Sequence, residues 1–88
     1  MNLNPIASST SEVISSVPMS ISSVVLVGGT ANSSVEISDS TDGNSNIKIE
    51  LKVLANDSKP FYFDGHIDFS KVYSKIAGSG AKVYIYNT

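Results

Sequence analysis

No cysteine occurs in this 88-residue chain, and its absence excludes a disulfide framework and a thiolate metal site. A single domain of this length hides only about 60 to 65% of the surface that its unfolded chain exposes. Domains this small often gain stability from disulfides, metal ions or a second subunit. Because cysteine chemistry is excluded, we expect burial against another subunit to contribute.

Basic charge is also scarce: six Lys and Arg residues against eight Asp and Glu residues give a formal net charge of −2. The basic residues are scattered along the chain, whereas nucleic-acid-binding domains gather them into a patch. We therefore expect no nucleic-acid partner.

Long apolar runs are missing too. The longest covers residues 24–27, which falls far short of the about 20 residues that span a bilayer. Residues 1–5 lack the basic start and apolar stretch of a secretory signal. We expect a protein that is made in a cytoplasm and has no membrane partner.

The chain does have a succession of short strand patterns separated by turn residues. Strands are expected at residues 21–27, 34–38, 61–63 and 81–86. The strands at 21–27 and 34–38 are expected to pair as a meander, and Asp64-Gly65 is expected to end the strand at 61–63. The clearest strand is residues 47–53, where charged residues alternate with four apolar residues that share one face: Ile47, Ile49, Leu51 and Val53.

Residues 67–76 fit two periods. Alternate residues from Ile67 to Lys71 suit one face of a strand, whereas Phe69, Val72 and Ile76 have helical spacing. We expect extended structure with a turn.

Residues 1–20 differ from the rest, because they are rich in Ser and Asn, include Pro5 and Pro18, and have only scattered apolar residues. We interpret them as an extended N-terminal arm and residues 21–88 as the β-sandwich domain. Within the arm, residues 12–17 are either an edge strand that Pro18 ends or part of a flexible tail. The predicted fold is all-β, a small sandwich or barrel of about 6–8 short antiparallel strands.

The single histidine, His66, lies between Asp64 and Asp68, a pattern that could hold a metal ion or provide a base. Gly65 favours a turn, and no second histidine is present. A solvated loop is therefore the preferred interpretation.

Hard oxygen ligands surround Gly43, and they suggest a calcium loop formed by Asp39, Asp42 and Asn44. The alternating acids and distal Glu of such a loop are absent, so a hairpin turn is preferred. Serine is abundant, but no motif places a base beside one. We predict no enzyme, no cofactor and no metal ion.

Tyrosines are the strongest candidates for partner contacts, because Tyr combines apolar area with a polar tip. In a regular strand over residues 81–86, Tyr84 and Tyr86 point away from Val83 and Ile85. They then either cover a second buried layer or face a partner. The predicted partner-contact residues are Val13, Ile14, Val17, Tyr62, Tyr84 and Tyr86.

Residues 24–39, VVLVGGTANSSVEISD, resemble the strand, Gly-rich link and strand of small β-sandwich virion proteins of tailed bacteriophages, of the capsid cement or decoration type. Phe63 and residues 67–73 and 76–86 are similar to the ending of that group, which has a Phe, an apolar-Tyr pair, Gly-x-Gly-Ala and a last alternating strand. The likeness covers residues 21–86. Lys71 departs from it, because relatives tend to have Gly before the apolar-Tyr pair.

The resemblance implies a small jelly-roll-like β-sandwich that oligomerises, often as a trimer, and stabilises the phage head by bridging neighbouring capsid subunits. The implied location is the capsid surface of the virion, and the implied partners are the major capsid protein or other virion proteins. Residues 1–20 would reach across subunit boundaries. Alternatives are a neck, tail or fibre component, a host-surface carbohydrate-binding module that uses the tyrosines, and, ranked last, a metal-dependent enzyme centred on His66.

Overall fold

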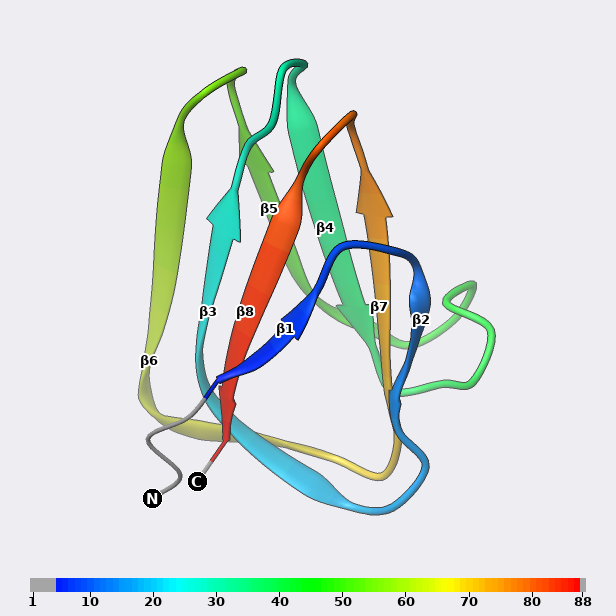
Figure 1. The fold of residues 1–88 in the computed structure, drawn as a ribbon. Coiled ribbons are helices and arrows are strands. Elements are labelled where there is room, and N and C mark those ends of the chain that lie inside the picture. The colour runs from blue at the N-terminus through cyan, green and yellow to red at the C-terminus, as the bar shows by residue number, and fades with distance from the viewer. Residues whose placement is uncertain (1–4, 88) are drawn as a thin grey trace.

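The computed structural model describes residues 5–87, without the side chain of Phe63. These residues form eight β-strands and no helix (Figure 1). They form two antiparallel sheets, sheet A in the order β1-β8-β3-β6 and sheet B in the order β2-β7-β4-β5. The predicted all-β sandwich is confirmed. The strands are β1 (Ile6–Ser8), β2 (Glu12–Ser15), β3 (Met19–Val27), β4 (Ser33–Ser38), β5 (Ile47–Val53), β6 (Ser58–Phe69), β7 (Val72–Ala77) and β8 (Lys82–Asn87).

The strand pairing is nested: β4 pairs with β5, β3 with β6, β2 with β7, and β1 with β8. The chain is therefore one long antiparallel hairpin that is rolled up, so that it crosses between the sheets after every strand except β4 (Figure 1). Eight strands arranged in this way form a jelly roll. The expected meander of residues 21–27 and 34–38 is wrong, because β3 and β4 lie in different sheets.

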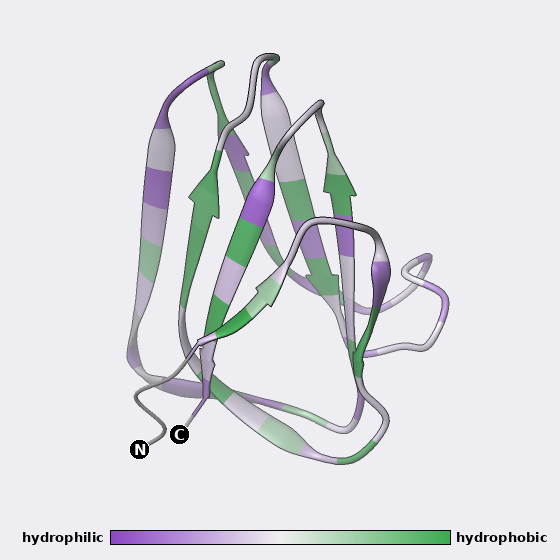
Figure 2. Ribbon diagram, in the orientation of Figure 1, coloured by the Kyte–Doolittle hydropathy of each residue, from purple (hydrophilic) through white to green (hydrophobic). Residues whose placement is uncertain are grey.

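The core lies between the sheets, and alternation of period two along the strands supplies it. In β5, Ile49, Leu51 and Val53 are buried as predicted, while Lys48 and Glu50 are exposed; Ile47, predicted to share the apolar face, is 45% exposed. Figure 2 shows this alternation as bands along β4, β7 and β8. The buried apolar cluster consists of Ile21, Val24, Leu26, Val35, Ile37, Ile49, Leu51, Val53, Phe69, Val72, Val83 and Ile85.

Strand β6 continues through Asp64 and Gly65, where the sequence predicted its end. Between the pairs Ser23↔Tyr62 and Ile21↔Ile67, four residues of β6 face a single residue of β3. This bulge absorbs Gly65, whose φ is +106°, and pairing resumes beyond it. The expected extended structure with a turn in residues 67–76 is confirmed, because β6 ends at Phe69 and β7 begins at Val72.

The described part of the predicted arm is extended and lies along the sandwich. Strand β1 pairs with β8, and β2 pairs with β7, so the edge-strand interpretation holds for Glu12–Ser15. Ile14 packs against the core, and the Ser11 hydroxyl accepts a hydrogen bond of 3.0 Å from the Ile76 N–H. Residues 6–15 thus close one side of the same sandwich as β3 to β8, while residues 1–4 lie outside the described part.

Candidate functional site

Three of the four tyrosines lie on the outer face of sheet A. The register places Tyr62 of β6 and Tyr86 of β8 on either side of Ser23 in β3. Tyr84 lies beside Val25 in the next row. On β3 and β8, the core residues Val24 and Ile85 point inward. Because side chains alternate along a strand, Ser23 and Val25, Tyr84 and Tyr86, and Tyr62 opposite Ser23 point outward. We call this set the tyrosine face: Tyr62, Tyr84, Tyr86, Ser23, Val25, Pro60 and Ala7.

The tyrosine face is uncharged and open to solvent. Tyr62 is 74% exposed, and Tyr84 and Tyr86 are partly exposed. The register places charged residues only beyond the set, with Lys82 opposite Val27 towards one end and Asp68 towards the other. Tyr rings are rigid and amphipathic, so a surface of this kind binds a protein or a sugar at a small cost in side-chain entropy.

The other predicted contact residues lie elsewhere. Val13 is 45% exposed and pairs with Tyr73 in sheet B, and Val17, 63% exposed, follows β2. Ile14 is partly buried against the core. The structure therefore brings Tyr62, Tyr84 and Tyr86 together but separates them from the three arm residues.

His66 contacts Asp68, as the sequence pattern suggested, but in an exposed setting. Its Nε2 lies 3.2 Å from Oδ1 of Asp68, and their side chains are 50% and 76% exposed. The Ser20 hydroxyl donates to the same Oδ1 atom at 2.5 Å. Ser20 and His66 both contact the Asp68 carboxylate, which is not the Ser-to-His link that a nucleophilic triad needs.

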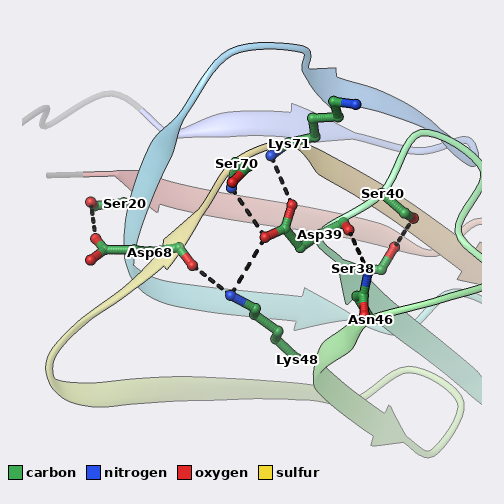
Figure 3. Close-up of polar contacts among 9 residues, drawn as sticks. All are labelled: Ser20, Ser38, Asp39, Ser40, Asn46, Lys48, Asp68, Ser70 and Lys71. Carbon is green, nitrogen blue, oxygen red and sulfur yellow. Dashed lines mark hydrogen bonds and ion pairs between the residues drawn. The ribbon is translucent and has the colours of Figure 1, made fainter.

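Asp39 lies at the centre of a polar clasp between the two sheets (Figure 3). Its carboxylate accepts hydrogen bonds from the backbone N–H of Ser70 at 3.2 Å and of Lys71 at 3.0 Å. Lys48 lies 3.6 Å from this carboxylate and donates to the Asp68 carbonyl at 2.8 Å. The clasp therefore ties the end of β4 and the start of β5 to the turn between β6 and β7.

The clasp sets the protonation of Asp39. The N–H groups of Ser70 and Lys71, followed by the charge of Lys48, lower the pKa of its carboxyl. Of the proposed calcium ligands, Asp42 instead accepts a hydrogen bond from the N–H of Asn44 within the loop. The loop joins the antiparallel pair β4 and β5, which is the hairpin turn preferred from the sequence.

Within residues 5–87, no three His, Asp or Glu side chains converge into a group that could hold a metal ion. The same residues include no helix long and apolar enough to cross a membrane. Four members of the tyrosine face were not predicted from the sequence: Ser23, Val25, Pro60 and Ala7. Alternation along β3 could have marked the first two as outward, but only the strand order places them between the tyrosines.

Comparison with known proteins gives no relative: no protein-family model, no curated protein and no solved structure matches the chain.

Proposed function

We propose that this chain is a structural virion protein of a tailed bacteriophage, a capsid cement or decoration protein that binds neighbouring capsid subunits through its tyrosine face. The carrying observation is the convergence of Tyr62, Tyr84 and Tyr86 on one uncharged face of sheet A. Its partner is the major capsid protein or another virion protein, and its location is the capsid surface.

The physical support is that Tyr is enriched where proteins bind one another. A Tyr ring buries a large apolar area while its hydroxyl keeps a hydrogen bond, and it has few rotamers to lose. The outer face of sheet B instead presents Glu36, Glu50, Lys52 and Lys75, as a solvated surface does. The two faces therefore favour sheet A as the side that meets a partner.

The fold adds an argument by analogy. Jelly rolls occur in viral capsid domains, which agrees with the family resemblance of residues 21–86. Repeated capsid sites would multiply a weak contact through multivalent attachment. Val13 and Val17 are exposed in the later part of the predicted arm, residues 1–20, and we propose that they form a second contact to a neighbouring subunit. The trimer implied by the resemblance stays a prediction.

The test is cosedimentation of the purified chain with capsid shells from the phage that encodes it, stripped of their accessory proteins. We expect stoichiometric binding, weakened about 30-fold by Tyr84→Ala and by Tyr62→Ala, as for a residue at an interface centre. Lys75→Ala, on the outer face of sheet B, is the control and should bind normally. Circular dichroism checks that each variant is folded.

Two results would overturn the proposal. One is wild-type protein that stays in the supernatant at saturating shell concentration. The other is undiminished binding by both tyrosine variants. Binding to isolated necks, tails or fibres but not to head shells would move the protein to the alternative location in the virion.

A host-surface carbohydrate-binding module is the second candidate, and the bulge of β6 favours it. Asp64 and His66 follow Tyr62 by two and four residues within this bulge, and both are exposed. Aromatic rings that stack on a sugar beside carboxylates that accept its hydroxyl groups are a common combination. Glycan-array binding that Tyr62→Ala and Asp64→Asn both abolish would select this function over capsid attachment.

A further inference from the structure

The two sheets end in four edge strands, and three of them carry features that oppose pairing with another strand. Strand β1 has only three residues, and β2 is interrupted by a register shift between Val13 and Ser15. Strand β6 includes Pro60, which has no N–H, and the bulge at Gly65. Edge protection is therefore built into β1, β2 and β6.

Strand β5 lacks such backbone interruptions over most of its length, and its exposed charges, Lys48, Glu50 and Lys52, oppose every partner strand except one of complementary charge. Its only irregularity is the register shift opposite Ile37 and Ser38, close to Lys48. From Ile49 to Val53 it pairs residue by residue with β4, and no strand among residues 5–87 pairs with its other side. The regular stretch has Leu51 at its centre, Glu50 and Lys52 on either side, and no Gly or Pro.

The charges across sheet B are unbalanced next to this edge. Glu36 of β4 lies directly opposite Glu50 of β5, and Lys75 of β7 balances the row only on the far side of Glu36. Like charges directly opposite each other destabilise a sheet. Lys52 lies 3.6 Å from Glu50, but its side chain is 76% exposed. A cation beside Glu50 on the free edge would complete the row.

We propose that two copies of this chain pair antiparallel through β5, with Leu51 opposite Leu51 of the second copy. This register sets Glu50 of each chain against Lys52 of the other, and Ile49 against Val53. The row then reads Lys75, Glu36, Glu50 and the second copy's Lys52, so each acidic residue has a basic neighbour. Two four-stranded sheets become one continuous eight-stranded sheet.

The pairing is two-fold, because each copy offers the same strand to the other. It stands apart from the proposed capsid function, since β5 and the tyrosine face belong to different sheets. It also differs from the trimer that the resemblance implies. The mass of the protein in solution therefore tests the β5 pairing, whereas cosedimentation with capsid shells tests the proposed function, and either can fail without the other.

Light scattering of the full chain over a concentration series, coupled to size exclusion, is the test. We expect the mass of two chains for the wild type. Lys52→Glu alone places acidic side chains opposite acidic ones, and Glu50→Lys alone places basic opposite basic. Each variant should raise the dimer dissociation constant about tenfold or more. Lys59→Glu, on the other free edge strand β6, is the matched control and should leave the dimer unchanged.

Mixing the two variants provides the decisive arm. The Lys52→Glu chain is acidic at both positions and the Glu50→Lys chain is basic at both, so the mixture should form a mixed dimer that is tighter than the dimer of either variant alone. A mass of one chain or of three chains for the wild type would overturn the pairing, as would a dimer that neither single variant weakens or a mixture that stays monomeric.

Discussion

The two sheets have similar inner faces and different outer faces. Inside, both present mainly aliphatic residues, such as Val24 and Leu26 in sheet A and Val35 and Ile37 in sheet B. Outside, the tyrosine face of sheet A is uncharged, whereas sheet B presents Glu and Lys residues. The inner pattern is what any sandwich needs to fold. The outer pattern is not dictated by folding, so the difference between the two outer faces carries the information about partners.

The inner faces of the two sheets stay in contact only if the loops that join the sheets hold them together. The largest effect on stability is therefore expected in these loops. The Gly29 loop between β3 and β4 packs against the loop between β7 and β8, where Thr30 N–H donates to the Ser79 carbonyl at 3.0 Å. A Cβ on Gly29 would lie 1.9 Å from this oxygen. We expect Gly29→Ala to lower the free energy of unfolding by about 2 to 3 kcal/mol, as overpacking does. Urea denaturation measures it, with exposed Thr30→Ala as the neutral control.

The two sheets also differ in the number of buried serines. Sheet B has Ser33, Ser38 and Ser74, whereas sheet A has Ser8. Ser74 is fully buried, and its hydroxyl has no hydrogen-bond partner. Ser38 is equally buried, but its hydroxyl bonds to that of Ser40 at 3.0 Å. We expect Ser74→Ala to raise the free energy of unfolding by about 1 kcal/mol and Ser38→Ala to lower it by a similar amount. Equal effects of the same sign would refute this distinction.

The charged outer face of sheet B contains one unfavourable pair, Glu36 opposite Glu50. We expect Glu50→Gln to raise the free energy of unfolding of the single chain by about 0.3 kcal/mol, because it removes the like-charge opposition and leaves Lys75 opposite Glu36. The gain should shrink at high salt, where the repulsion is screened. Thermal melts at two ionic strengths measure it, and a gain that does not depend on salt would assign the effect to another cause.

The smallest effect concerns the clasp, because Asp39 is partly exposed and solvent screens its contacts. The pKa of Asp39 is lower in the folded chain than in the unfolded chain, so its ionised form stabilises the fold. The contribution is complete above the unfolded pKa and is lost as the pH falls through the lowered folded pKa, below pH about 4. Asp39→Asn should therefore be less stable than the wild type at pH 7, and the difference should shrink at acid pH. A difference that grows on acidification would contradict the assigned pKa shift.

The sequence predicted the elements whose pattern is local. Strand β5 was predicted with its observed bounds, because its alternation is complete from Ile47 to Val53. Strand β1 was missed, because three residues after Pro5 have no pattern and become a strand only by pairing with β8. The continuation of β6 through Gly65 was missed for a similar reason, since β3 holds both sides of the bulge.

The candidate site was predictable only in part. Alternation indicated that Tyr84 and Tyr86 point away from the core, but their meeting with Tyr62 depends on β3 lying between β8 and β6. Asp39 was considered as a calcium ligand and then assigned to a hairpin turn, but its contacts with the backbone N–H groups of Ser70 and Lys71 were not predicted. Contacts between residues so distant in sequence leave no local signal.

The nested pairing of the strands has a consequence for the route by which the chain folds. Partners in β4 and β5 are near neighbours in sequence, whereas β1 and β8 join the two ends of the described chain. Loop-closure entropy grows with the length of chain between partners, and folding slows as more contacts are non-local. We expect the β4-β5 hairpin to form first and each outer pair to add to the one within it. Strands β1 and β8 at the ends of the described chain would then come together last, as the step that completes sheet A.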